Sequence, residues 1–438
     1  MSKDDSNIEN KTDVIVVGGG PAGISAAVTV ARSGKKVILI ERGKFAGSKN
    51  VFGGAIYTKP TKEIFPDFEK TAPLERKNIE HKYALLGEED STVISYRQKD
   101  EDAESYTVIR SKFDRWMAKE AMKEGVIVVE ETVVRELILD ENRVVGIKTE
   151  LEDYYSDIVI LADGVNSLLS EQIGLKKEIK PEDVALSVKE VFKIPEEKIN
   201  ERFNINDDEG CIYQLFGGPM LGMLGLGFIY TNENSVSIGL GITLNELIER
   251  KINPYDLLED LKSHPTIAPL IKDGELLEYS AHLIPEAGYK KLPELYAAGV
   301  MVAGDAGMLV NNIHWEGTNL AMISGKLAGE TAIIALSKKD FSEKTLSRYQ
   351  EALKKSFIMK DLYTYREVLD VLHKKSKDFL GYYPQKINGF FKIFTSVDCI
   401  PKRDKYREFI KSIFTDRKIP VLFSDFGNII KLIGSVLK

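Results

Sequence analysis

The feature that most constrains this fold is a glycine motif between two β-rich segments. Gly18-x-Gly20-x-x-Gly23 stands between a β-rich run at 12–17 and a helix-like segment at 21–32. A second β-rich run, 36–40, follows and ends at Glu41. This order predicts a β-α-β unit whose glycines permit a tight turn, close approach to a pyrophosphate and helix–strand packing. The acid at the second strand end is placed to accept hydrogen bonds from ribose hydroxyls and disfavours a 2′-phosphate, so the motif predicts a site for NAD or FAD.

Composition narrows the classes of function. The chain has 438 residues, a net charge of -7 and two cysteines, Cys211 and Cys399. This length predicts two or three packed units, and the acidic balance gives no electrostatic basis for binding nucleic acid. Two cysteines cannot make a disulfide framework, a tetrahedral zinc site or a cluster held by four thiolates. We therefore predict no metal site and expect any electrons to be carried by an organic cofactor.

The sequence carries no strong membrane or secretion signal. Its N-terminal segment 1–11 is polar and lacks an apolar core, and its longest apolar run, 220–230, contains three glycines. That run has about half the length of a membrane-spanning helix. The sequence therefore predicts a cytoplasmic protein that reaches a membrane only peripherally.

Further motifs identify the type of dinucleotide site. Arg110-x-x-Phe113-Asp114 opens a helix-like segment, and the pairs Asp163-Gly164 and Gly304-Asp305 each follow an apolar run. With the first glycine motif, they stand in the order found in FAD proteins shaped like p-hydroxybenzoate hydroxylase and geranylgeranyl reductase, which this chain resembles. The resemblance favours FAD over NAD. It implies that Asp305 binds the ribityl chain and that Arg110 and Asp163 line the flavin site.

A narrower resemblance covers nearly the whole chain. Lys49-Asn50-x-x-Gly53-Gly54 and the segments 228–241 and 317–325 are similar to those of FixC proteins, which are relatives of electron-transfer-flavoprotein:quinone oxidoreductase. The motifs and the resemblance together predict these FAD-binding residues: Gly18, Gly20, Pro21, Ala22, Gly23, Glu41, Arg42, Lys49, Gly53, Gly54, Arg110, Val134, Asp163, Gly164, Gly304, Asp305, Gly317, Thr318 and Asn319.

The resemblance implies an α/β fold with three parts. It predicts a discontinuous Rossmann-like FAD-binding domain, an inserted quinone or substrate domain with an antiparallel sheet, and a helical C-terminal region. The FAD-binding domain would comprise 1–60, 105–180 and 293–340, the inserted domain 61–104 and 181–292, and the helical region 341–438. Gly317-Thr318-Asn319 would open a long helix whose free N–H groups raise the flavin reduction potential.

The missing cysteines indicate the electron route. The quinone oxidoreductase binds a four-iron cluster through four cysteines, whereas FixC proteins lack them and are thought to use a separate ferredoxin-like subunit, FixX. The resemblance thus implies an FAD subunit that receives electrons from FixX, ultimately from electron-transfer flavoprotein subunits, and reduces menaquinone or ubiquinone. We find neither a second glycine motif nor a redox cysteine pair, which argues against direct reduction by a nicotinamide.

The quinone site is predicted from the apolar insert and one bulky segment. Tyr213, Leu221, Leu224, Phe228 and Trp315 are its candidate residues, although each also suits a packed core. His314 is either a proton donor to a reduced quinone or a structural histidine, because its ordinary pKa lies near neutrality. No residue is predicted to be catalytic with certainty.

The C-terminal tail combines basic and apolar residues. Seven lysines and arginines between 402 and 418 precede an apolar helical face formed by Phe426, Ile429, Ile430, Ile433 and Leu437. This pattern is typical of an interfacial helix on an anionic membrane, or of a helix docked on this protein or on a partner subunit.

Three other functions share these motifs. A geranylgeranyl-reductase-like enzyme would saturate isoprenoid lipids and would also need an apolar insert. A prenyl-binding protein such as a Rab escort protein would have the fold without a working FAD site. A flavin monooxygenase would require rapid reduction by NAD(P)H.

Overall fold

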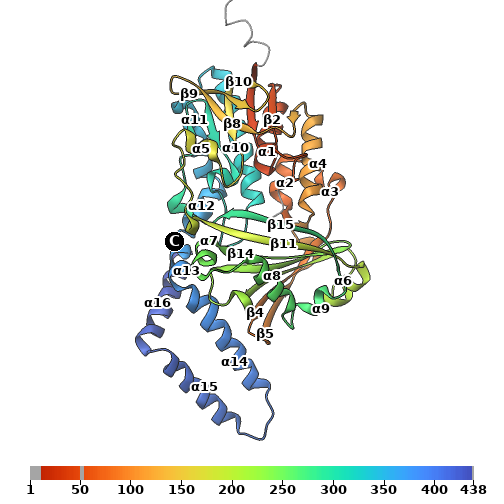
Figure 1. The fold of residues 1–438 in the computed structure, drawn as a ribbon, viewed down its shortest axis with the longest axis vertical. Coiled ribbons are helices and arrows are strands. Elements are labelled where there is room, and N and C mark those ends of the chain that lie inside the picture. The colour runs from red at the N-terminus through yellow and green to blue at the C-terminus, as the bar shows by residue number, and fades with distance from the viewer. Residues whose placement is uncertain (1–10, 50–53, 437–438) are drawn as a thin grey trace, which may run out of the picture.

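Two sheets and a helical arm make up the protein (Figure 1). The computed structural model describes residues 11–49 and 54–436. The first sheet and its helices form one end, the second sheet lies across the middle, and the last helices extend from the other end. The predicted α/β fold is confirmed.

The first sheet is built on parallel strands. β1 pairs in parallel with β2 and β10, and β10 pairs in parallel with β17, which confirms the predicted β-α-β unit. Its strand order is β16-β17-β10-β1-β2-β7, and the hairpin β8–β9 joins the edge of β10. The strands are β1 (Lys11–Val17), β2 (Val37–Ile40), β7 (Ile127–Val129), β8 (Val134–Asp140), β9 (Arg143–Thr149), β10 (Asp153–Leu161), β16 (Tyr296–Ala297) and β17 (Val300–Val302).

Two helices pack closely beside this sheet. α1 (Pro21–Arg32) contacts α10 (Thr318–Lys338), while α4 (Arg110–Lys123) lies beside α1. Small residues allow the approach, because a Cβ on Gly325 would lie 2.0 Å from the Ala22 carbonyl oxygen. α10 is long and apolar enough to cross a membrane by length and composition alone, but 61% of its apolar window is buried here. It is a core helix of this domain.

A turn separates β7 from β8, which follow each other closely in the chain. Between them, Glu131 has a left-handed φ of 54°, and its N–H donates to the Gly43 carbonyl at 2.9 Å. The N–H of Thr132 donates to the Glu41 carbonyl at 3.0 Å. These bonds hold the turn after β7 against the end of β2. Val134, which follows the turn, lies in the wall of a cavity.

The second sheet is mainly antiparallel and has the order β15-β11-β14-β13-β12-β4-β6-β3, with β5 beside β4. One pair, β12 with β4, is parallel, because β4 comes from a distant segment and no hairpin fixes its direction. The strands are β3 (Ala55–Tyr57), β4 (Lys77–Leu86), β5 (Ser91–Arg97), β6 (Ser105–Thr107), β11 (Val184–Lys193), β12 (Glu209–Gly217), β13 (Gly225–Thr231), β14 (Ser235–Thr243) and β15 (Glu275–Pro285).

Two features of this part differ from the sequence prediction. β3 and β6 lie within ranges that we assigned to the FAD-binding domain, yet they pair in the second sheet, where the chain crosses between the two units. The inserted domain, expected to contain an antiparallel sheet, also contains helices, which cover the sheet face away from the first unit and bury a separate apolar core. They are α6 (Glu196–Phe203), α7 (Leu244–Arg250), α8 (Pro254–Ser263) and α9 (Ala268–Ile271).

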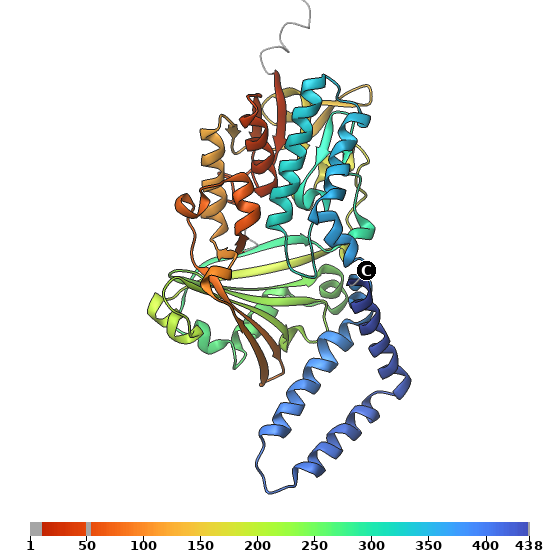
Figure 2. The same ribbon diagram turned by 180° about the vertical axis from the view of Figure 1, so that it is seen from behind.

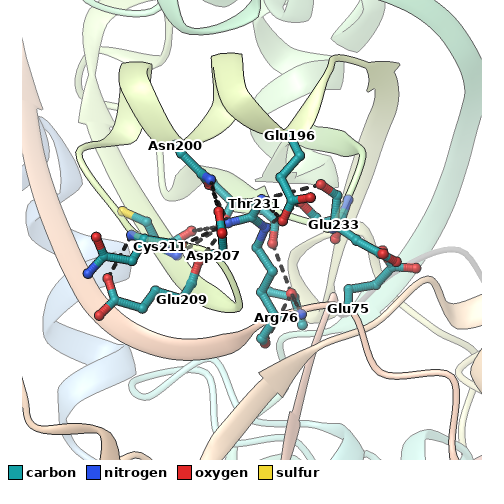
Figure 3. Close-up of polar contacts among 12 residues, drawn as sticks. Glu75, Arg76, Glu196, Asn200, Asp207, Glu209, Cys211, Thr231 and Glu233 are labelled. Atoms are coloured by element: carbon teal, nitrogen blue, oxygen red, sulfur yellow. Dashed lines mark hydrogen bonds and ion pairs between the residues drawn. The ribbon is translucent and has the colours of Figure 1, made fainter.

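A buried arginine ties the second unit together (Figure 3). Arg76 is 1% exposed, and its Nε donates to the Asn232 carbonyl at 2.8 Å. Its Nη1 donates to Asn200 Oδ1 at 2.7 Å and to the Glu209 carbonyl at 3.0 Å, and its Nη2 lies 3.4 Å from Glu196 Oε1. One guanidinium, directly before β4, therefore connects the start of this strand with α6, with the start of β12 and with the residue after β13.

The predicted helical C-terminal region is confirmed. α11 and α12 pack beside the first unit, whereas α14, α15 and α16 project from the molecule as an arm (Figures 1 and 2). The arm returns to its base through Asp425 on α16, which accepts from the Tyr383 hydroxyl at 2.8 Å and pairs with Lys375 at 3.2 Å. The helices are α11 (Glu343–Lys355), α12 (Phe357–Thr364), α13 (Val368–Ser376), a π-helical turn (Lys377–Tyr382), α14 (Tyr383–Thr395), α15 (Lys402–Asp416) and α16 (Ile419–Val436).

Candidate functional site

A cavity of about 820 Å³ lies between the two sheets. One half is formed by the carboxyl ends of the parallel strands, where ligands of open α/β sheets bind. The other half is formed by one face of the second sheet, and the loop before α10 borders both.

The glycine motif forms a tight turn at the first half. Gly18 has a φ of 107°, and a Cβ there would lie 2.2 Å from the Ala162 carbonyl oxygen. A Cβ on Gly23 would lie 1.9 Å from the Gly18 carbonyl oxygen. α1 then begins at Pro21 with Gly20 as its N-cap and no side chain capping it. Backbone N–H groups of this helix start are thus available to an anionic ligand in the cavity.

Glu41 is fixed at the end of β2. It is buried, its Oε2 accepts from the Gly19 N–H at 2.8 Å, and its Oε1 accepts from the Gly43 N–H at 2.6 Å. Because a carboxylate has about four acceptor positions, these two bonds leave capacity for hydroxyl donors in the cavity that Glu41 lines.

Arg110 places a buried cation at the junction of the two halves. Its guanidinium makes two hydrogen bonds of 2.9 Å to Asp114, whose side chain is fully buried. Its Nη1 lies 3.4 Å from the Thr318 hydroxyl at the start of α10. This bidentate geometry holds the cation beside the N-terminus of a long helix.

Two carboxyl groups with little water around them line the same cavity. Burial raises the pKa of Asp163 to about 6, although it accepts from the Ser167 hydroxyl at 2.9 Å. Burial also raises the pKa of Asp305 to about 6, against the opposing charge of Arg110. Hydrogen-bond donors from a bound ligand would compensate for this lost hydration. The glycine cradle, the fixed acid and these two carboxyls fit FAD.

Most predicted FAD-binding residues meet at this cavity. Gly23 and Gly304 lie behind its wall, where a Cβ on Gly304 would lie 2.7 Å from Ala22 Cβ. Gly54 is close to the Tyr230 ring, Asn319 is buried and donates to Glu316 Oε2 at 3.1 Å, and Gly53 lies outside the described residues. The predicted residues that line the cavity are Gly18, Gly20, Pro21, Ala22, Glu41, Arg42, Lys49, Arg110, Val134, Asp163, Gly164, Asp305, Gly317 and Thr318.

The apolar half of the cavity corrects two quinone-site predictions. Leu224, Phe228 and Trp315 line it, but Tyr213 and Leu221 do not. Tyr213 points to the opposite face of β12, where its ring lies 5.9 Å from that of Phe203. Side chains alternate along a strand, so the cavity-facing residues of β12 are Ile212, Gln214 and Phe216.

His314 and Trp315 stand in the loop that borders the cavity. The exposed His314 ring packs edge-on against Tyr365, with centroids 4.8 Å apart. The Trp315 ring lies 5.7 Å from that of Phe216, and its backbone has a left-handed φ of 56°. The sequence analysis missed other wall residues, namely Leu226, Tyr230, His282, Glu286, Val368, Leu369, Leu372 and Leu380. Strand alternation could have indicated those on β13 and β15.

Metal ligands do not gather in the part of the chain that the structure describes. No group of three or more His, Cys, Asp or Glu residues within 11–49 and 54–436 could hold a metal ion. Cys211 is buried, Cys399 is exposed, and both are free thiols.

Three family models match separate parts of the chain. Residues 13–164 match the FAD dependent oxidoreductase family, and residues 184–284 match a domain described as ETF-QO, ubiquinone-binding. Residues 368–433 match the ETF-QO/FixC family C-terminal domain. The first match contains the glycine turn and β10, the second contains β11 to β14 and nearly all of β15, and the third contains α13 to α15 and most of α16.

Curated relatives match almost end to end. Protein FixC of Bradyrhizobium diazoefficiens is 41% identical over 425 residues, which cover 95% of this chain and 98% of the relative. Protein FixC of Azotobacter vinelandii is 41% identical over 94% of this chain and 97% of the relative. Protein FixC of Escherichia coli K12 is 40% identical over 85% of this chain and 88% of the relative.

Solved structures share the fold at low identity. A geranylgeranyl bacteriochlorophyll reductase-like protein from Thermoplasma acidophilum has a TM-score of 0.69 and 22% identity, with 93% of this chain and 99% of that chain covered. A flavin-dependent brominase has a TM-score of 0.62 and 16% identity, with 93% of this chain and 100% of that chain covered.

Proposed function

This chain belongs to the FixC family and is an FAD-dependent oxidoreductase, and we propose that it passes electrons from a ferredoxin-like iron–sulfur partner to a quinone. In this proposal it is the FAD subunit of an assembly that also contains electron-transfer flavoprotein subunits. The observation that carries the proposal is the single cavity with a nucleotide-binding half and an apolar half. A flavin and a flat apolar acceptor would then share one space.

The first half of the cavity would hold FAD through residues already in position. The start of α1 would bind the pyrophosphate, Glu41 a ribose, and Asp305 the ribityl hydroxyls. Arg110, fixed by Asp114, would supply a positive charge beside them. When bound, FAD supplies the capacity to accept electrons singly and to donate them in pairs.

The second half would bind the quinone mainly by excluding water. Phe216, Leu224, Leu226 and Phe228 bring apolar side chains from β12, β13 and the segment before β13, and Trp315 adds an indole from the opposite loop. A cavity walled mostly by apolar and aromatic groups with a few polar ones suits a ring with two carbonyl oxygens. The domain model that matches residues 184–284 supports this assignment.

The electron source would be a separate protein. The two cysteines of this chain cannot supply the four thiolates of a cluster. A partner of the FixX type would supply the cluster, and the arm, matched by the family's C-terminal model, is a candidate contact for it.

Reconstitution tests the proposed route. Purified protein is mixed with reduced electron-transfer flavoprotein and a quinone, with and without the iron–sulfur partner, and quinol formation is followed. We expect quinol only when the iron–sulfur partner is present. Saturation of a prenyl lipid by the protein alone, rapid flavin reduction by NADPH, or a colourless protein would contradict the proposal. These outcomes would indicate a geranylgeranyl-reductase-like enzyme, a monooxygenase or a prenyl-binding protein, respectively.

The start of α10 is expected to influence the flavin reduction potential, and a substitution there can test this. Gly317 lines the cavity as the N-cap, and a Cβ there would meet only Val310 Cγ2 at 3.8 Å. A Gly317→Glu side chain therefore has room, and its negative charge would oppose the helix dipole. We expect the flavin midpoint potential to fall by tens of millivolts in a spectroelectrochemical titration, about 1 kcal/mol of charge interaction. Gly317→Gln, of equal size and no charge, should change it little; an unchanged potential in Gly317→Glu would contradict this role.

We also propose that the protein contacts the cytoplasmic membrane face through its arm. Phe394, Phe423 and Phe426 are 62%, 72% and 60% exposed. α15 lies between α14 and α16 in the arm (Figure 1), and it carries basic side chains. An apolar surface with nearby cations suits an anionic lipid surface.

Liposome co-sedimentation tests the arm. The double substitution Phe423→Ser and Phe426→Ser should weaken binding to vesicles of anionic phospholipid by at least about tenfold, because each buried phenyl contributes about 1.5–3 kcal/mol. Leu151→Ser is a matched control, since Leu151 is 80% exposed on the β9–β10 turn in the other unit. Equal binding of the double variant and the unmodified protein would assign this surface to a partner subunit instead.

A further inference from the structure

One carboxyl group in the cavity, that of Glu286, is not among the predicted FAD-binding residues. Glu286 follows the last residue of β15 and lines the cavity, as do His282 and Ile284 at alternate positions of the same strand. Its backbone N–H donates to the Asp183 carbonyl at 2.7 Å. The strand end is therefore fixed, with the carboxyl group on the cavity side of the second sheet.

The loop before α10 closes over this carboxyl group. Asn312 Nδ2 donates to the Pro285 carbonyl at 2.6 Å, and the Asn312 side chain also hydrogen-bonds to Glu286. Val310 and Ile313 of the same loop line the cavity beside Asn312. The loop thus joins the end of β15 to the start of α10, at the meeting point of the two cavity halves.

No cation neutralises Glu286 among the residues that the structure describes. Burial raises its pKa to about 8, and only the Asn312 hydrogen bond opposes this shift. The Asp183 carboxylate is already paired with Lys291. Burial, Arg110 and Arg42 lower the pKa of His282, which favours its neutral form. Other titratable groups on neighbouring segments are His314 and Glu316 on the loop, Glu182 beside Asp183, and Asp370, His373, Lys374 and Lys375 on α13. None of them is among the causes of the Glu286 shift.

We propose that Glu286, rather than His314, is the acid that gives a proton to the quinone; this rests on the proposed function. Both residues line the cavity, but Glu286 is held at the fixed end of β15, whereas His314 is exposed and packs on Tyr365. A carboxyl group kept neutral by its surroundings can donate a hydrogen bond to a carbonyl oxygen and then transfer the proton.

The proton balance is simple. FAD bound in its reduced anionic form would supply two electrons and one proton, whereas formation of a quinol from a quinone consumes two electrons and two protons. Glu286 supplies the second proton: its O–H bond breaks, an O–H bond forms on a quinone oxygen, and a carboxylate remains. The carboxylate then takes a proton from water, so each turnover restores the acid.

Infrared spectroscopy of the oxidised holoenzyme tests the protonation state without turnover. The difference between the unmodified protein and Glu286→Gln should contain a carboxylic acid C=O band at pH 7 that disappears with a midpoint near 8. Absence of this band at pH 7 would overturn the proposal. Glu275→Gln, an exposed position on the same strand, should leave the band in place.

Reoxidation of the reduced flavin by a soluble short-chain quinone tests the transfer. The limiting rate of the unmodified holoenzyme should fall above about pH 8, because the acid is then ionised. Glu286→Gln should be slower by about 10²-fold with no such pH limb, and Glu286→Asp should recover part of the rate. The quinone concentration giving half the limiting rate should change little, since the apolar wall is intact.

The outcomes separate the two proposals. If the unmodified holoenzyme does not reduce quinone at all, the proposed function fails. If it does, and Glu286→Gln has the same rate and pH limb, the role of Glu286 fails alone. Loss of the pH limb in His314→Gln instead would assign the proton to His314 and overturn the inference. FAD content and melting temperature, measured for each variant, identify any rate change caused by misfolding.

Discussion

Gly18→Ala is expected to abolish FAD retention. The new Cβ would lie 2.2 Å from the Ala162 carbonyl oxygen and 3.1 Å from the Asp163 nitrogen, both of which belong to the backbone. Relief requires β1 and the end of β10 to separate, which opens the turn that leads into α1. FAD per protein, measured from the absorbance of the purified variant, should fall at least about tenfold, since backbone strain of this kind costs about 1–3 kcal/mol before any loss of ligand contacts.

Gly34→Ala is the matched control for that substitution. Gly34 follows α1 with a φ of 77°, yet nothing lies within 4 Å of its added Cβ. Alanine at this position therefore has the cost of a left-handed backbone, about 1 kcal/mol, but its Cβ does not collide with other atoms. FAD content should remain near that of the unmodified protein. Equal FAD loss in both variants would show that general destabilisation, and not the turn geometry, controls binding.

Arg76→Ala should produce the largest loss of stability in the second unit. The substitution leaves carbonyl oxygens of Asn232 and Glu209 without their buried donor (Figure 3). It also removes the bond to Asn200 and the ion pair with Glu196. Removing one partner from a buried charged network costs about 3–5 kcal/mol. Chemical denaturation followed by circular dichroism should show this decrease in the free energy of unfolding.

The control for Arg76 is a cation on the surface. Lys148 pairs with Glu136 at 3.0 Å, with the two side chains 48% and 58% exposed. Lys148→Ala should leave the free energy of unfolding nearly unchanged, because an exposed ion pair contributes little. A loss for Arg76→Ala no greater than this would contradict the structural role assigned to the buried guanidinium.

Local sequence patterns predicted which residues the parallel strand ends bring together. Gly18, Glu41 and Asp163 lie at strand ends, and parallel strands end at the same edge of a sheet, so their meeting follows from the order of the motifs. The start of α10 at Thr318 was predicted for the same reason. The end of a strand or the start of a helix is determined mainly by residues close by in the chain, so short segments are enough to predict these positions.

The apolar half depended on information that a short segment does not contain. Tyr213 and Phe216 are both apolar enough for either face of β12, and only the helices packed on one side decide which face meets the cavity. Glu286 owes its surroundings to Asp183 and Asn312, which are far away in sequence. The parallel pairing of β12 with β4 is equally non-local.

The strand order of the first sheet has a consequence for biosynthesis. β1 and β2 leave the ribosome early, but their neighbour β10 comes much later, and β17 and α10 later still. Until α10 emerges, the face of α1 around Ala22 lacks the glycine-lined surface that covers it in the finished protein. Asp305 and Gly317 are also missing from the nascent chain until then. The complete cavity therefore cannot form before α10 has been made, and until then the growing chain carries α1 without the helix that covers its apolar face.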